Sequence, residues 1–366
     1  GGAPFGSQRG ERETGIASDM NIRDLIRLRF GFYRLVYVRP TDSCPIQCRH
    51  CCGSFGPRGS TTASASDLKE WIASIGLLGR VEWIGIEGGE PFAVLPELSA
   101  ILQASSQWGL STAVLTSAFW ARSARKASDI LGRLPEISLL ILSTDEFHEE
   151  FVPLEHISHA LEAVFERGMN AALQICVGPD HEAFMRRLSA RVGPDMWNRL
   201  EVIRTPLQRV GRAKELPSLD TSGKEDPLPN GYCLFLGTPV IRENGDLIAC
   251  CQQEVIHSGP FQLFRLGHMG SLNLKEAVNR IDSDVYFQTL RVFGPKAIAL
   301  EALKHRWGWR PQAGGYGSMC ELCRDLALQN GVVAGFRARR DEKEYWDELA
   351  LARLAFYGES QPVDTG

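Results

Sequence analysis

Ten cysteines stand out among the residues of this 366-residue chain that can do metal or redox chemistry. A long chain without a secretory signal keeps its cysteines reduced, which favours metal or redox roles over disulfides. Their grouping supports this interpretation. The first group is Cys44, Cys48, Cys51 and Cys52, the second is Cys233, Cys250, Cys251, Cys320 and Cys323, and Cys176 stands apart.

The first group lies in the sequence TDSCPIQCRHCC, where Cys44, Cys48 and Cys51 have CxxxCxxC spacing directly after a predicted strand. Parallel α/β proteins hold their chemistry at the carboxyl ends of strands. Three thiolates suit an iron–sulfur cluster, and they leave one iron of a four-iron cluster open. Two alternatives remain, a zinc site completed by His50 or Cys52 and a redox-active disulfide.

A glycine-rich turn follows the next predicted strand and reads EGGEPF. Gly88 and Gly89 allow a ligand to approach the backbone closely, and Glu90 and Pro91 then form a polar turn. Such turns are common, but this one falls at the strand end beside the cysteine loop. The sequence therefore predicts that the two motifs lie together.

Short apolar runs alternate with amphipathic stretches over the first two thirds of the chain. Strands are predicted over residues 32–38, 81–86, 112–115, 138–142, 171–177 and 200–203. Helices are predicted from Ser64, with Ser or Asp as the N-cap, and over residues 95–106, 123–134, 154–168 and 181–192. This alternation predicts parallel βαβ units. Six units are too few for a closed eight-stranded barrel, so we expect a partial barrel.

The CxxxCxxC loop, the GGEP turn and about six βα units together closely resemble the radical S-adenosylmethionine (SAM) enzymes, over roughly residues 33–212. The resemblance implies that Cys44, Cys48 and Cys51 hold a [4Fe–4S] cluster whose open iron chelates the amino and carboxylate groups of SAM. One electron from the cluster then cleaves SAM to methionine and a 5′-deoxyadenosyl radical. That radical abstracts a hydrogen atom from the substrate.

The same resemblance implies SAM contacts at the turn and in the cysteine loop. Gly88, Gly89, Glu90 and Pro91 are expected to bind the SAM amino group. His50 stands where the family usually has an aromatic residue that packs on adenine.

Later strand ends match the family less closely. Thr116 keeps its place, but Ser117 and Ala118 replace the last two residues of the family's frequent Thr-Asn-Gly. Ser143 and Asp145 are candidate contacts to the ribose or carboxylate of SAM, and a helix N-cap is the equal alternative.

Cys176 and His148 each carry two interpretations. Cys176 lies in a predicted strand, where a buried thiol is usually a core residue; if it faces the barrel interior, it can return a hydrogen atom to a substrate radical. His148 follows the fourth predicted strand, and a surface or capping role competes with one in the active site.

The second cysteine group has the order C…GxxxxC…CxxC and resembles the shortened SPASM type, the twitch domain. That resemblance implies an auxiliary [4Fe–4S] cluster held by Cys233, Cys250, Cys320 and Cys323. Cys251 competes with Cys250, and structural zinc is the alternative to the cluster. A full SPASM domain needs more cysteines, so we expect two clusters in all.

The predicted fold is therefore α/β: a partial (β/α)6 TIM-like barrel, then a small cysteine-rich twitch/SPASM-like domain and C-terminal helices. Its segments are a flexible leader with a short helix at 1–31, the barrel at 32–214, a linker at 215–232, the auxiliary cluster domain at 233–330 and a C-terminal helix and tail at 331–366. Within the cluster domain we expect a hairpin that turns at Asn244 and Gly245.

Composition excludes several classes of protein. The chain is 44% hydrophobic and 23% charged, with a net charge of −4, so bulk electrostatics give no case for nucleic acid binding. Neither a membrane-spanning apolar run nor a signal-like N-terminus is present. The sequence predicts a cytoplasmic protein.

The expected substrate is a ribosomally made peptide that the enzyme crosslinks or epimerises. Such a function needs a reductant such as flavodoxin or ferredoxin, and a separate leader-peptide-binding protein. One alternative is oxidation or epimerisation of a small polar metabolite such as an aminoglycoside. A non-catalytic iron–sulfur binding or sensing module is the other, and the GGEP turn argues against it.

Overall fold

A computed structural model describes residues 33–216, 226–257 and 261–359 of the chain. The leader and short helix expected at residues 1–31 lie outside this part, as do residues 217–225 of the expected linker.

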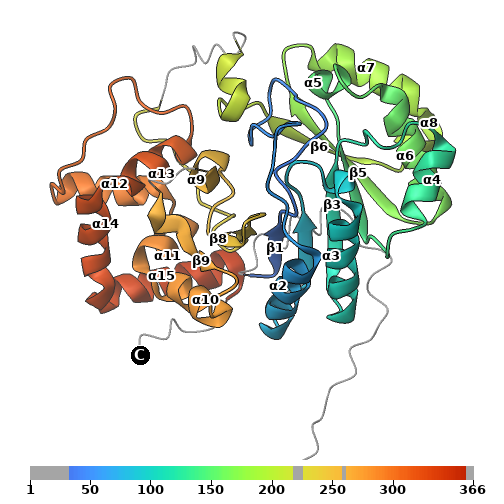
Figure 1. Cartoon of the computed structure of the whole chain (residues 1–366). Helices are drawn as coiled ribbons and strands as arrows, with labels where there is room; N and C mark the ends of the chain where they lie inside the picture. The colour runs from blue at the N-terminus through green and yellow to red at the C-terminus, as the bar shows by residue number, and fades with distance from the viewer. Residues whose placement is uncertain (1–32, 217–225, 258–260, 360–366) are drawn as a thin grey trace, which may run out of the picture.

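Six parallel strands form the barrel half of the molecule, in the spatial order of the sequence. They are β1 (Leu35–Val38), β2 (Trp83–Ile86), β3 (Ser111–Thr116), β4 (Leu139–Ser143), β5 (Asn170–Val177) and β6 (Glu201–Pro206). All six predicted strands are present, and their ends move by at most three residues. All six carboxyl ends therefore meet at the same edge, where the cysteine loop follows β1 (Figure 1).

Helices connect these strands and pack along the outside of the sheet (Figure 1). The five predicted helices are α2 (Ala65–Leu77), α3 (Leu95–Gln107), α4 (Ala124–Leu131), α6 (Leu154–Glu166) and α7 (His181–Val192). The Ser64 side chain caps α2 by accepting a hydrogen bond from the backbone N–H of Asp67. The short helices α5 (Glu146–Glu149) and α8 (Pro194–Trp197) were not predicted, because four residues carry too little periodicity.

A hairpin of the C-terminal part continues the barrel sheet. Strands β7 (Val240–Ile241) and β8 (Asp246–Ile248) pair antiparallel around the predicted turn at Gly245, which has a φ of 85°. β7 also pairs parallel with β1, and β9 (Arg265–His268) pairs with β8, giving nine strands with β6 and β9 at the edges. The sheet is therefore open, and it continues from one cysteine-bearing part into the other.

Six longer helices and several short ones complete the C-terminal part, beside the barrel in Figure 1. They are α9 (Gln253–His257), α10 (Leu274–Ser283), α11 (Val285–Val292), α12 (Pro295–Lys304), α13 (Met319–Ala327), α14 (Asn330–Arg337) and α15 (Lys343–Tyr357), with 3-10 turns at Gln262–Phe264 and Ala338–Asp341. The barrel half has two further 3-10 turns, at Pro91–Ala93 and Gly211–Glu215. Across the described segments, no helix has the length and apolar character needed to span a membrane.

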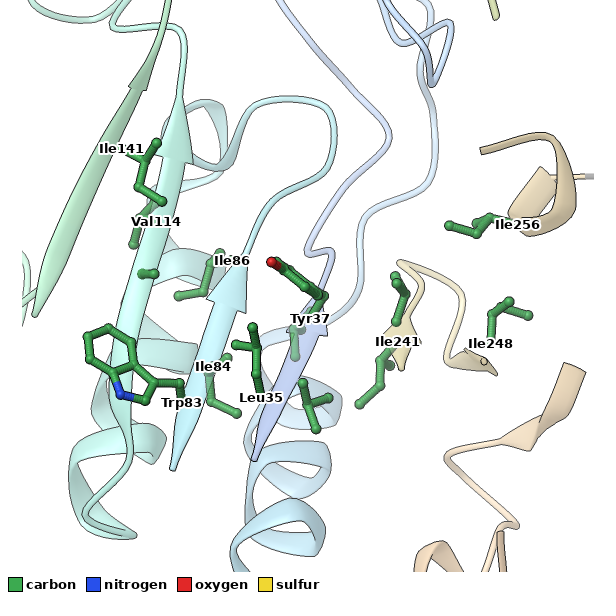
Figure 2. Packing of buried hydrophobic residues seen from close by; sticks show 14 of the residues in the cluster. Leu35, Tyr37, Trp83, Ile84, Ile86, Val114, Ile141, Ile241, Ile248 and Ile256 are labelled. Atoms are coloured by element: carbon green, nitrogen blue, oxygen red, sulfur yellow. The ribbon is translucent and has the colours of Figure 1, made fainter. Parts of the chain in front are cut away.

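One hydrophobic core runs through both parts. Figure 2 shows barrel residues such as Leu35 and Ile84 on one side of β1 and Ile241, Ile248 and Ile256 on the other, all in the same buried cluster. Full burial of one such side chain contributes about 1.5–3 kcal/mol. The shared core thus fixes the position of the second cysteine group relative to the barrel.

Candidate functional site

The cysteine loop after β1 is closed by its own backbone. The N–H of Cys44 donates to Gly56 O at 3.1 Å, and the N–H of Cys51 donates to Cys48 O at 3.2 Å. Cys44 and Cys48 are only 8% and 4% exposed. Burial, with smaller contributions from Glu90, Cys48 and Cys51, raises the pKa of the Cys44 thiol to about 12. The three cysteines belong to one small apolar cluster, and binding of a metal would displace the proton of the Cys44 thiol.

The GGEP turn docks directly onto this loop. The N–H of Gly89 donates to Thr41 O, and the N–H of Glu90 donates to Ser43 O, both at 2.9 Å. A Cβ on Gly89 would lie 2.0 Å from Ser43 O, and Gly88 has a φ of 133°. Both glycines are thus required by close backbone approach, here to the loop itself.

The Glu90 carboxylate ties the ends of β2 and β3 together. It is 1% exposed and accepts hydrogen bonds from Thr116 Oγ1 at 2.7 Å and from the Ser117 N–H and hydroxyl at 2.9 and 2.6 Å. It also accepts from the Phe92 N–H at 3.1 Å. Burial raises the pKa of Glu90, and these donors oppose that rise. Glu90 and Thr116 are therefore joined by a buried hydrogen bond, although they lie at the ends of two different strands.

Ala118 closes the same turn with a φ of 61° and is fully buried. This is the position at which the resembling family often has glycine, which adopts positive φ without strain. The departure from Thr-Asn-Gly thus leaves the backbone geometry in place and puts a methyl group on it.

Asp145, at the end of β4, contacts two histidines. It caps α5 by accepting from the N–H groups of Phe147 and His148, so the N-cap alternative holds for this residue. Its carboxylate oxygens also lie 3.1 Å from His50 Nε2 and 2.9 Å from His148 Nδ1. Burial would raise the pKa of Asp145, but the two histidines hold it below its usual range. Ser143, also expected near SAM, is the half-buried last residue of β4.

The imidazole of His50 stacks on Phe147, with ring centroids 4.7 Å apart, and meets His148 edge-on at 4.9 Å. His148 therefore contacts His50 of the cysteine loop, and only 13% of its side chain is exposed. The resemblance predicted that His50 packs on the adenine of SAM. In the structure its imidazole packs on the ring of Phe147.

The segment after β6 covers the cysteine loop from the other side and was missed from the sequence. The Arg212 N–H donates to Cys51 O at 3.1 Å, and its Nε donates to Cys48 O at 2.9 Å. A Cβ on Gly211 would lie 2.4 Å from Cys51 O. The only feature of the sequence that could have indicated this contact is the Gly-Arg pair, Gly211 and Arg212, shortly after the last barrel strand.

Cys176 lies near the carboxyl end of β5 and is half-buried. The neighbouring residues Leu173 and Ile175 are fully buried core residues on the opposite face of the strand. Burial raises the pKa of the Cys176 thiol to about 12, and Asp145 and Cys52 add to the rise. Cys176 therefore faces the site and not the helix-covered core.

The second cysteine group is assembled from three segments. Cys250 follows β8, Cys320 and Cys323 lie on α13, and the Cys233 N–H donates to Leu290 O of α11 at 3.0 Å. Burial raises the pKa of Cys323 far above its usual value, and Cys233, Cys250 and Cys320 raise it further. The four expected residues therefore lie near enough to influence one another, and Cys250, from the adjacent pair, is among the thiols that raise the pKa of Cys323.

Arg39 links the two cysteine groups and was also missed. It is 1% exposed at the end of β1 and lies 3.1 Å from Glu87, before the GGEP turn. It also donates to Gln253 Oε1 at 2.7 Å, just after Cys251. A buried arginine with partners on both sides couples the two loops.

Sequence comparison finds no matching protein-family model and no similar curated protein. Solved structures do match. The structure titled anSMEcpe with bound AdoMet and Kp18Cys peptide has 13% identity and a TM-score of 0.50, covering 88% of this chain and 99% of that one. Streptococcus suis SuiB bound to precursor peptide SuiA has 13% identity and a TM-score of 0.49, covering 70% and 68%. BtrN in complex with AdoMet and 2-DOIA has 12% identity and a TM-score of 0.43, covering 72% and 89%.

At these identities the similarity concerns the fold. The radical SAM enzymes among these structures have partial TIM barrels, and the open parallel sheet with C-terminal helices described here is the same architecture. The predicted fold class is thereby confirmed.

Proposed function

We propose that this chain is a radical SAM enzyme with one auxiliary iron–sulfur cluster. The observation that carries the proposal is the docking of the GGEP turn on the cysteine loop, through the Gly89 and Glu90 N–H groups. A cluster with a merely structural role needs three or four thiols but no glycine turn pressed against them. The pairing therefore favours a cofactor bound beside the docked loop and turn.

The donor set at the barrel end fits a [4Fe–4S] cluster with an open iron. Cys44, Cys48 and Cys51 belong to one apolar cluster, and the carbonyls of Cys48 and Cys51 are held by Arg212. The buried Nδ1 of His50 has no hydrogen-bond partner, as expected of a group next to a ligand. When bound, the reduced cluster supplies the electron that cleaves SAM to methionine and a 5′-deoxyadenosyl radical.

The remaining residues of the site would bind and orient SAM. Backbone groups of Gly88, Gly89 and Pro91 line the turn, and Glu90 holds its shape because its carboxylate accepts from Thr116 and Ser117. Glu90 and Thr116 then act mainly as positioning residues.

His50, stacked on Phe147, would offer its imidazole to the adenine of SAM. Ser143 and Asp145 complete the site at the end of β4, with Asp145 fixing the orientation of the imidazole.

Cys176 is the proposed hydrogen-atom donor. Its thiol is kept protonated by burial and faces the same strand ends as the cysteine loop. A neutral thiol keeps its hydrogen atom available, whereas a thiolate has none to give. The measurement is deuterium gain by the product in deuterated buffer. Unchanged gain in Cys176→Ala would contradict the role.

The auxiliary cluster would be held by Cys233, Cys250, Cys320 and Cys323, in preference to Cys251. The mutual influence of these four thiols supports the set. Four thiols fit an iron–sulfur cluster or a structural zinc, and the radical SAM fold favours the former.

For the substrate we propose a ribosomally made peptide. The support is the shared fold with anSMEcpe, which was solved with a bound peptide. Electrons would come from a small reductant protein of the flavodoxin or ferredoxin type, and a separate partner would bind the leader peptide.

The direct test is release of 5′-deoxyadenosine from SAM by the anaerobic, reduced, cluster-loaded chain. We expect release by the wild type and none by Cys48→Ala. Absence of release from a wild type that carries its full iron would reject the proposed function.

A further inference from the structure

A second metal site overlaps the cysteine loop. Cys48, His50 and His148 each offer one ligand atom, and these three atoms lie within 4.8 Å of one another. Around a tetrahedral zinc, with bonds of about 2.0–2.3 Å, such atoms would be about 3.5 Å apart. Small side-chain rotations are therefore enough to bring them onto one ion.

Asp145 prepares both histidines for this role. One carboxylate oxygen lies 3.1 Å from His50 Nε2 and the other lies 2.9 Å from His148 Nδ1. Metal-bound histidines typically give their second ring nitrogen to a carboxylate, which fixes the tautomer and aims the first nitrogen at the ion. Asp145 faces one nitrogen of each imidazole at ion-pair distance, so His50 Nδ1 and His148 Nε2 are the nitrogens that it does not face and that could bind the ion.

The His50 nitrogen left over is a second, independent indication of a ligand. Nδ1 of His50 is buried and has no hydrogen-bond partner among the described residues, and the same holds for His148 Nδ1 and Asp145 Oδ2. A buried polar atom without a partner destabilises the folded chain. Ligation of a metal ion would remove that cost.

We propose that the chain, when it lacks its iron–sulfur cluster, binds one divalent transition ion such as Zn²⁺ through Cys48, His50 and His148. One thiolate and two imidazoles suit zinc, with the fourth position open to water. Cys48 cannot serve this ion and the proposed cluster together. Zinc therefore excludes the cluster and must leave before the cluster is built.

The experiment uses Co²⁺, a spectroscopic stand-in for zinc, titrated anaerobically into the full cluster-free chain. The second cysteine group binds its own Co²⁺ in every variant, so the difference between variants reports this site. We expect His50→Ala with His148→Ala to remove one Co²⁺ per chain. Asp145→Asn should weaken that Co²⁺ by about 10–100-fold, the usual effect of losing such a carboxylate.

Matched controls separate this ion from the cluster. Cys44→Ser should keep the Co²⁺ but lose the iron of the barrel group after reconstitution. The double histidine variant should lose the Co²⁺ but keep the iron of the barrel group. His305→Ala, at a half-exposed histidine far along the chain on the surface, should change neither. Thermal unfolding of each variant checks that it folds.

Loss of the Co²⁺ in Cys44→Ser would overturn the proposal, because it would mean that the three cysteines hold the ion. Retention of full Co²⁺ affinity by the folded double histidine variant would overturn it too. Neither result depends on SAM cleavage, so failure here is distinguishable from failure of the proposed function.

Discussion

The two cysteine groups are built in opposite ways. In the barrel group three thiols lie within eight residues of one loop, and the surrounding strand ends hold that loop through its backbone. In the C-terminal group four thiols come from segments up to 90 residues apart, joined by a hairpin and helices. The first site is therefore local and preformed. The second exists only when the tertiary structure is complete.

The largest effect is expected from Cys323→Ala, because one missing thiol leaves the C-terminal group with three scattered ligands. We expect complete loss of the auxiliary cluster, so that iron per chain falls from about eight to about four. Iron and sulfide analysis under anaerobic conditions measures it.

Cys251→Ala is the matched control for that change and should retain all of its iron. Iron loss in Cys251→Ala with none in Cys250→Ala would reverse the proposed ligand choice.

The preformed barrel group predicts a thiol shielded from reaction. Since burial raises the pKa of Cys44 from about 9 to about 12, its thiolate fraction near pH 8 should be about a thousandfold lower than in the unfolded chain. Iodoacetamide labelling of the cluster-free chain, read by peptide mass, should show slow alkylation that keeps rising above pH 9.

The raised pKa of Cys44 also makes the stability of the folded chain depend on pH. Between about pH 9 and 12 the unfolded chain gives up the Cys44 proton and the folded chain keeps it, so the stability of the folded chain falls as pH rises through this window.

In the labelling experiment, a rate of Cys44 alkylation that levels off near pH 9 would contradict the shielding of this thiol.

Gly89→Ala tests the turn that holds the barrel group. The added Cβ would meet Ser43 O at 2.0 Å, and such overpacking costs about 1–3 kcal/mol. We expect SAM affinity, measured by equilibrium dialysis on the cluster-loaded chain, to fall by about 10–100-fold with little change in the C-terminal iron.

Gly56→Ala, in the same loop but with its nearest contact at 3.6 Å, should leave SAM affinity unchanged. Equal losses in both variants would show that the loop tolerates no side chain at all, and the docking account would fail.

The smallest effect is expected from Ala118→Gly. Relief of the positive φ at this buried position should stabilise the folded chain by about 0.5–1 kcal/mol. Chemical denaturation measures it. Ala121→Gly, at a buried position without positive φ, should destabilise the chain instead, and stabilisation by both would leave the strain argument without support.

Much of the barrel could be predicted from the sequence because its signals are local. Alternating apolar runs give β1 to β6, the Ser64 cap gives the start of α2, and the Asn-Gly turn gives the β7–β8 hairpin. The cysteine loop and the GGEP turn each follow a strand, so parallel topology brings them together.

What could not be predicted depends on contacts between distant segments. The pairing of β7 with β1 involves two residues in each strand, too few to leave a pattern. Arg39 has partners on both sides of that junction, and His148 enters the site only because Asp145 caps a four-residue helix. Arg212 reaches backbone carbonyls, which leave no trace in side-chain spacing.

The central claim is that two separate cysteine groups each hold a cluster. The most direct test is iron and sulfide per chain, under anaerobic conditions, in the wild type and in the Cys44→Ala, Cys48→Ala, Cys51→Ala triple variant. The account predicts about eight irons in the wild type and about four in the variant. Almost no iron in a folded triple variant would contradict it, because the C-terminal group would then hold zinc or nothing.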